Sequence, residues 1–186
     1  MYFFQSGFGG FWLWAFFLTC TCWQMEGGGY FIPYTVWPEA AERLSRCDGE
    51  SEKVQVAGNS KGEMVLLWLK NKTFYQAAFS QNWGENFSYP YDLENEGRAC
   101  FLGALALNSQ SRALALWGRS EQGTVLLEQV ISQNGGKSWS LPATLLSLEG
   151  LGYFNVALND REEALLLGLE KDQRLFGAFS QDGGTN

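Results

Sequence analysis

The sequence predicts an all-β fold built from a repeated unit of roughly 50 residues, and three observations support this prediction. The polar stretch Ser132–Trp139, SQNGGKSW, recurs in part at Ser180–Gly184 and more loosely at Ser80–Phe87. The apolar runs between these stretches are only five to seven residues long, which is too short for most helices. The chain also has 22 glycines and 4 prolines, a ratio that suits many tight turns between short strands.

The first two strands of each unit are predicted around an asparagine. The first strand ends near this asparagine, a tight turn follows, and the second strand is a continuous apolar run that ends nine positions after the asparagine. A continuous apolar run predicts a strand that is covered on both faces. The three asparagines are Asn59, Asn108 and Asn159, and the corresponding strand ends are Trp68, Trp117 and Gly168.

The third and fourth strands complete each predicted unit. The third strand ends at the serine of the polar stretch, which places it over residues 74–80, 125–132 and 174–180. The fourth strand is short and ends at Pro90 or Pro142, because a missing N–H is tolerated at a sheet edge. The turns between the second and third strands are expected at residues 69–73, 118–124 and 170–173, and the links between units at 91–101 and 143–153.

The first 45 residues allow two interpretations. Trp23–Pro33 aligns without a gap on Ser132–Pro142, which favours a degenerate unit whose third strand is Phe17–Cys22. Alternatively, Phe11–Leu18 resembles the apolar region of a signal peptide, although no Lys or Arg precedes it. The predicted organisation is a degenerate unit or apolar leader over residues 1–45, followed by units over 46–97, 98–148 and 149–186.

The composition excludes several classes of partner and cofactor. The net charge of -7 and the pI of about 4.6 disfavour a phosphate backbone as partner, so we expect no nucleic-acid binding. The chain has no histidine, the commonest metal ligand, and we expect neither a metal nor another cofactor. The apolar runs are too short to cross a bilayer, so no transmembrane span is expected. An extracellular or cell-surface location is favoured.

Four cysteines leave the redox state open. Cys20 and Cys22 lie two residues apart, a spacing that is not typical of zinc ligands. One interpretation is a pair of buried thiols on the same face of a strand. The other is a disulfide with Cys47 or Cys100, which would require an oxidising compartment.

Each residue type of the polar stretch has a structural role in a hairpin. The side chain of Asn134 or Asp182 can accept backbone N–H groups at the bend. The serine hydroxyl adds a bond across the loop, and the glycines permit positive φ. Trp139 can fold back and cover the apolar side of the hairpin. We therefore interpret the stretch as scaffold rather than as a catalytic site.

The stretch resembles the Asp box, or BNR repeat, of sialidases and related propeller proteins. The resemblance implies a partial β-propeller of repeated four-stranded antiparallel blades, with the box at the turn between the third and fourth strands and away from the ligand face. Asn134 replaces the aspartate of the family pattern, and the copy at Ser80 lacks the second Ser or Thr. The residues placed in the structural turn are Ser80, Asn82, Gly84, Phe87, Ser132, Asn134, Gly136, Trp139, Ser180, Asp182 and Gly184.

No catalytic residue follows from the resemblance. Sialidases hold a carboxylate with three arginines, and the first of these usually belongs to an Arg-Ile-Pro motif. The corresponding residues here are Phe31-Ile32-Pro33, with Phe in place of Arg. The loops opposite the boxes supply only ligand-face candidates, namely Arg98, Arg119 and Tyr153, of which either arginine can be expected to contact an acidic glycan.

Three functions remain open on the sequence. The first is a non-catalytic sialidase-like BNR-repeat module that binds a glycan or a protein. The second is a fragment of an exo-acting glycoside hydrolase of the sialidase type, whose catalytic residues lie mostly outside this chain. The third is a purely structural repeat protein without a small ligand. For each of them, association through open sheet edges is a further expectation.

Overall fold

The computed structural model describes residues 50–94 and 99–185, and in these residues every regular element is a β-strand. The predictions for residues 1–45, including the leader and the degenerate unit, lie outside the described residues. No helix long and apolar enough to cross a membrane is found in the described ranges. The strands are β1 Ser51–Gly58, β2 Met64–Lys70, β3 Phe74–Ser80, β4 Tyr91–Asp92, β5 Cys100–Leu107, β6 Ala113–Glu121, β7 Thr124–Ser132, β8 Ala143–Leu148, β9 Leu151–Leu158, β10 Ala164–Glu170 and β11 Leu175–Ser180.

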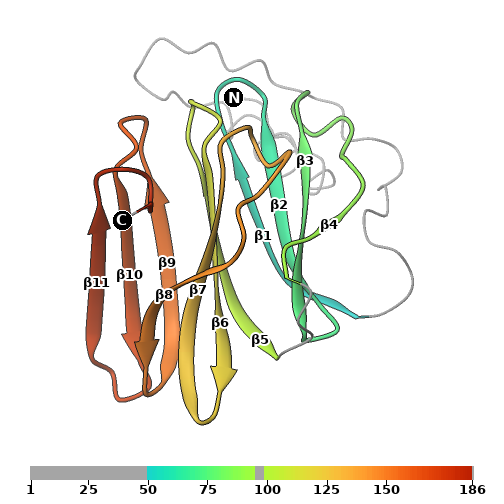
Figure 1. Cartoon of the computed structure of the whole chain (residues 1–186). Helices are drawn as coiled ribbons and strands as arrows, with labels where there is room; N and C mark the ends of the chain where they lie inside the picture. The colour runs from blue at the N-terminus through green and yellow to red at the C-terminus, as the bar shows by residue number, and fades with distance from the viewer. Residues whose placement is uncertain (1–49, 95–98, 186) are drawn as a thin grey trace, which may run out of the picture. The chain divides into compact units, whose positions relative to one another are not determined.

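The strands form three antiparallel sheets, each of which follows the order of the chain. Blade 1 is β1-β2-β3-β4, blade 2 is β5-β6-β7-β8, and blade 3 is β9-β10-β11. The sheets lie beside one another in chain order, and the hairpins between the first and second strands lie at the same end as those that follow the third strands (Figure 1). This arrangement of repeated antiparallel blades is a partial β-propeller, which confirms the predicted fold class.

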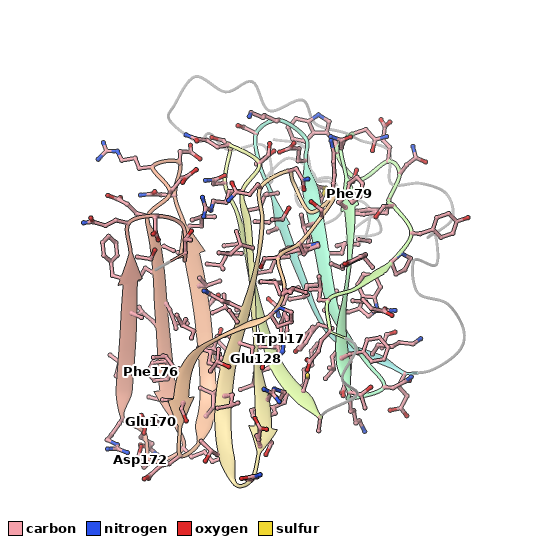
Figure 2. All side chains as sticks on the ribbon, viewed as in Figure 1. Phe79, Trp117, Glu128, Glu170, Asp172 and Phe176 are labelled. Carbon is pink, nitrogen blue, oxygen red and sulfur yellow. The ribbon has the colours of Figure 1, made fainter. Side chains whose placement is uncertain are left out.

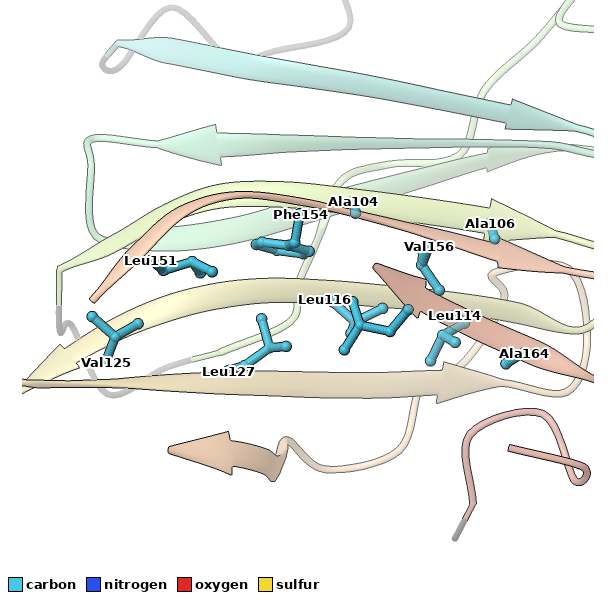
Figure 3. Close-up of a cluster of buried hydrophobic side chains, with 11 residues drawn as sticks. Ala104, Ala106, Leu114, Leu116, Val125, Leu127, Leu151, Phe154, Val156 and Ala164 are labelled. Atoms are coloured by element: carbon cyan, nitrogen blue, oxygen red, sulfur yellow. The ribbon is translucent and has the colours of Figure 1, made fainter. Parts of the chain in front are cut away.

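Two apolar cores hold the blades together. The core between blades 1 and 2 includes Leu67, Tyr75, Ala115 and Trp117, with the rings of Tyr75 and Trp117 stacked at a centroid distance of 5.6 Å. The core between blades 2 and 3 includes Leu114, Leu116, Phe154, Val156 and Leu166. Figure 3 shows Leu114, Leu116, Phe154 and Val156 between the strands of this cluster. Blade 2 contributes to both cores, so the apolar run of β6 is covered on both faces, as the sequence predicts.

Blade 3 is covered on one face only within the described residues. The residues of β10 alternate between buried and exposed, with Ala164 and Leu166 facing the core. The opposite face exposes a row of large apolar side chains. We call this surface the open face and define it by Tyr153, Leu165, Leu167, Leu169, Leu175 and Phe179.

The predicted strand bounds are correct for the first and third strands and wrong in two places. The fourth strands follow the prolines instead of ending at them: β4 begins at Tyr91 and β8 at Ala143. Proline lacks the N–H that pairs in a sheet, but it is tolerated just before a strand begins. The second prediction that fails is the end of the second strands, because β2 continues to Lys70, β6 to Glu121 and β10 to Glu170. The turns expected at 69–73, 118–124 and 170–173 are therefore shorter than predicted.

Candidate functional site

The polar stretch of blade 2 is a closed hydrogen-bonded turn between β7 and β8. The hydroxyl of Ser132 accepts from the backbone N–H of Gly136 at 2.9 Å and donates to Asn134 Oδ1 at 3.0 Å. Asn134 Oδ1 also accepts from the N–H of Ser138 at 3.0 Å. Ser132 is fully buried, so its bond to the N–H of Gly136 satisfies a group that water does not reach, whereas the bond to the N–H of Ser138 lies at the surface.

The same network recurs in the other two blades. In blade 1, Ser80 and Asn82 take the places of Ser132 and Asn134, and in blade 3 Ser180 and Asp182 do so. An amide oxygen and a carboxylate oxygen therefore accept equivalent bonds. The position after the bend has positive φ in each copy and is always glycine, namely Gly84, Gly136 and Gly184.

The aromatic residue that closes the stretch packs inward. Trp139 is half-buried against the core between blades 1 and 2. The ring of Phe87 lies close to Gly84 in blade 1. The serine side chains and the Asn or Asp side chains of these turns are bonded within the fold. The buried indole N–H of Trp139 has no hydrogen-bond partner, and its ring packs against the core. The bonded side chains support a scaffold role for the turn.

A ladder of asparagines, which the sequence interpretation used only as a strand marker, joins the blades at the same end. Asn59 Oδ1 accepts from the backbone N–H groups of Lys61 and Glu63, and Asn108 and Asn159 do the same in their own turns. Asn59 Nδ2 donates to the carbonyl of Asn108 at 2.9 Å, and Asn108 Nδ2 donates to that of Asn159 at 3.0 Å. The recurrence of asparagine at this position was the only signal in the sequence for the ladder.

Side chains four positions after the asparagine reach into the next blade. Glu63 Oε1 accepts from the hydroxyl of Ser111 at 2.8 Å. Arg112 Nη1 pairs with Glu162 at 2.8 Å, and its Nη2 donates to the carbonyl of Asp182 at 2.8 Å. Burial raises the pKa of the Glu63 carboxyl, but the hydrogen bonds from Ser111 and Asn59 outweigh it, so the net pKa is lowered.

The end opposite these turns holds a buried charged cluster between blades 1 and 2. Arg119 Nε donates to Glu128 Oε1 at 2.7 Å, and Arg119 Nη1 lies 3.3 Å from Glu121 Oε2. The indole N–H of Trp117 donates to the other oxygen of Glu128 at 3.1 Å, and Figure 2 shows these two side chains side by side. Burial alone would lower the pKa of the Arg119 guanidinium, but the bond and charge of Glu128 raise it. The guanidinium is therefore charged and held inside the fold.

Cys100 belongs to the same cluster. Its thiol donates to Glu94 Oε2 at 3.1 Å, and both residues are buried. Burial, this hydrogen bond and the negative charge of Glu94 raise the pKa of the thiol far above its ordinary value. Burial likewise raises the pKa of the neighbouring Tyr75 phenol. In this protonated, buried state the thiol of Cys100 is a poor nucleophile.

The structure describes two of the three ligand-face candidates from the sequence, Arg119 and Tyr153, and it does not bring these two together. Arg119 was expected on an exposed loop; it lies in β6 and is 6% exposed, because Glu128 on the neighbouring strand compensates its charge. Tyr153 is 59% exposed and lies on the open face of blade 3, paired across the sheet with Leu169. Arg98 lies outside the described residues. In the parts of the chain that the structure describes, no cluster of acidic or cysteine side chains could hold a metal ion.

Comparison with known proteins gives a likeness to solved structures only. No family model and no curated protein matches the chain. An ulvan lyase, a PL25 polysaccharide lyase, is 12% identical at a TM-score of 0.48; the match covers 75% of this chain and 34% of the lyase. An endo-arabinase from Bacteroides thetaiotaomicron is 14% identical at a TM-score of 0.48, with 78% and 60% of the two chains covered.

A third solved structure is an α-L-arabinofuranosidase from Podospora anserina. It is 8% identical at a TM-score of 0.48, and the match covers 73% of this chain and 56% of that one. This chain therefore spans 34% to 60% of the length of the three structures. At such identities a likeness concerns the fold and not the activity.

Proposed function

We propose that this chain is part of a non-catalytic, sialidase-like BNR-repeat propeller that acts as a binding module, and that its open face binds a protein. One observation carries the proposal: six large apolar side chains are exposed together on β9, β10 and β11. Contiguous exposed apolar surface of this kind is typical of protein interaction sites.

The pattern of the open face supports a protein partner in particular. Leu165 and Leu167 occupy in β10 the positions that Leu114 and Leu116 occupy in β6. Leu114 and Leu116 are 2% and 1% exposed because blade 3 covers them. The open face thus repeats a surface that already binds a β-sheet elsewhere in the molecule.

The test is self-association of the purified chain, because in such a sample a second copy of the chain can supply the protein surface that the open face binds. We expect sedimentation velocity to show concentration-dependent association, and Leu167→Lys to abolish it by placing a charge at the centre of the open face. Leu141→Lys is the matched control, because Leu141 is 88% exposed outside this face and the charge change is the same. Identical behaviour of the two variants would contradict the proposal.

The non-catalytic part of the proposal is supported by the state of the buried carboxylates. Both oxygens of Glu128 are bonded within the fold, and Glu94 accepts from Cys100. A glycosidase needs one carboxyl group as an acid and another as a nucleophile or base, both facing the substrate. Turnover of a fluorogenic sialoside by the chain would favour the alternative, a fragment of an exo-acting glycosidase.

A glycan is the second candidate ligand, and the exposed ring of Tyr153 is the observation that favours it. The ring lies near the end of β9 that is opposite the box turns. A tyrosine side chain has an apolar ring and a polar hydroxyl, so it suits a ligand that presents both apolar and polar groups. We expect Tyr153→Ala to lose glycan-array signal while Tyr89→Ala, an equally large change at an 86% exposed residue, retains it. Equal signals from both variants would remove the glycan from consideration.

A further inference from the structure

Asn134 and Gly135 form the only Asn-Gly pair in the sequence, and they lie in the turn between β7 and β8. An asparagine can lose its side-chain amide without an enzyme when the backbone nitrogen of the next residue attacks the side-chain carbonyl carbon. Glycine hinders this attack least, because it has no Cβ. The pair is therefore the position in this chain where such a modification is chemically easiest.

The closed turn engages every group that takes part in this reaction. The backbone N–H of Gly135 donates to the carbonyl of Ser111 at 2.6 Å, which keeps its proton in place. Asn134 Nδ2, the nitrogen that would leave, donates to Ser138 Oγ at 2.8 Å, and Asn134 Oδ1 accepts from the N–H of Ser138 at 3.0 Å. The attacking nitrogen, the leaving nitrogen and the carbonyl oxygen are thus all bonded to other partners.

A side chain from blade 1 covers Gly135. Gly135 is buried, and a Cβ built on it would lie 3.2 Å from Glu63 Oε1. The same carboxylate oxygen accepts from the hydroxyl of Ser111 at 2.8 Å, which holds it in this position. A negative charge beside Gly135 disfavours the loss of the backbone proton that the attack requires. The contact between blades 1 and 2 therefore adds to the protection that the turn itself gives.

We infer that Asn134 is a deamidation site, which the closed turn protects and which reacts when the turn between β7 and β8 opens. In the open turn, the Gly135 nitrogen loses its proton to solvent base and forms a bond to Asn134 Cγ. The bond from Cγ to Nδ2 breaks, and Nδ2 takes up a proton from water and leaves as ammonia. Water then opens the cyclic imide at either of its carbonyl carbons, which yields aspartate or isoaspartate.

The two products should affect the fold differently. Aspartate suits the turn, since Asp182 at the same place in blade 3 accepts from the hydroxyl of Ser180 at 2.6 Å and from the N–H of Thr185 at 3.1 Å. Isoaspartate instead routes the backbone through the side chain and adds a methylene group before Gly135. The N–H of Gly135 then loses its alignment with the carbonyl of Ser111. Formation of isoaspartate is therefore a one-way loosening of this end of blade 2.

The direct measurement follows the amide of Asn134 by peptide mass spectrometry while the full chain is incubated in mildly alkaline buffer. We expect the folded chain to lose the amide more slowly than the chain in guanidinium chloride by about tenfold or more, because the turn must open first. Equal rates in the two conditions would overturn the inference, and so would the absence of reaction in the denaturant.

Two serine variants separate the opening of this turn from a general loss of stability. Ser132 and Ser80 are both buried and accept equivalent bonds, but Ser80 lies in the turn of blade 1. We expect Ser132→Ala to speed the reaction at Asn134 in the folded chain about tenfold, because the N–H of Gly136 loses its acceptor. Ser80→Ala should leave the rate unchanged. Equal rates in the two variants would show that the turn between β7 and β8 is not the gate.

The difference between the products has its own test in urea denaturation. We expect Asn134→Asp to unfold at the same urea midpoint as the original chain, whereas an aged sample rich in isoaspartate should unfold at a lower midpoint. A lowered midpoint for Asn134→Asp would contradict the equivalence with Asp182. An unchanged midpoint for the aged sample would contradict the loss of the bond between Gly135 and Ser111.

Discussion

At the scale of single residues, the serine that begins each polar stretch stabilises the turn through its hydrogen bonds. Ser132 is fully buried and bonds both to backbone N–H groups and to Asn134. Ser132→Ala would leave the N–H of Gly136 buried without an acceptor, at a cost of about 1–3 kcal/mol in unfolding free energy. Urea denaturation measures this loss.

Ser138→Ala is the control for that substitution. Ser138 accepts from Asn134 Nδ2 at the exposed side of the same turn, where water can replace the bond. We expect its effect to stay within about 0.5 kcal/mol. If Ser138→Ala were as harmful as Ser132→Ala, the burial of the serine would not be the source of its importance.

Glu63 should give the fold a pH dependence of known sign. Its pKa in the folded chain is lowered from the ordinary value of 4.5, so the carboxylate stabilises the fold above that pH. This contribution is lost as the pH falls through the folded-state pKa. We expect the difference in unfolding free energy between the original chain and Glu63→Gln to be largest at neutral pH and to shrink in acid. A difference that grew below pH 4.5 would contradict the assignment.

At the scale of elements, equivalent leucines in β6 and β10 should differ in importance. Leu116 is 1% exposed and Leu167 is 47% exposed, although both lie at the same strand position. Leu116→Ala should cost about 2–5 kcal/mol, because it leaves a cavity between two blades. Leu167→Ala should cost less than about 1 kcal/mol. Thermal and urea unfolding of the two variants, at concentrations too low for self-association, measures these losses. Equal losses would mean that the open face is covered within the single chain.

Much of the strand pattern could be predicted from the sequence, because turns are local. Asn108 and Ser132 mark the ends of β5 and β7, and both bond to backbone groups within four residues. The end of β6 could not be predicted in this way. Arg119 and Glu121 are typical of a turn, and the main partner of Arg119, Glu128, becomes apparent only when the register of β6 and β7 is known. The burial of Arg119 was missed for the same reason, since its charge was assumed to be exposed.

At the scale of the whole molecule, the backbone amides of blade 2 should be the most strongly protected from hydrogen exchange. Blade 2 is covered on both faces, whereas blade 3 exposes most of β11 among the described residues. Local opening costs least where few apolar contacts must be broken. We therefore expect amide hydrogen exchange to be slowest in β6 and much faster in β11, as measured by mass spectrometry of peptide fragments. Equal protection of the two strands would show that blade 3 is covered by another surface.

The contacts between neighbouring turns also determine which blade can follow which. Glu63 meets the hydroxyl of Ser111, whereas Arg112 meets the carboxylate of Glu162. If blade 2 were removed and blade 1 joined directly to blade 3, Glu63 would face Glu162, and two carboxylates would repel each other. The end of the fold that carries the asparagine ladder thus disfavours assemblies in which a blade is missing or the order of the blades is changed. Blades that share one fold are in this way not interchangeable modules.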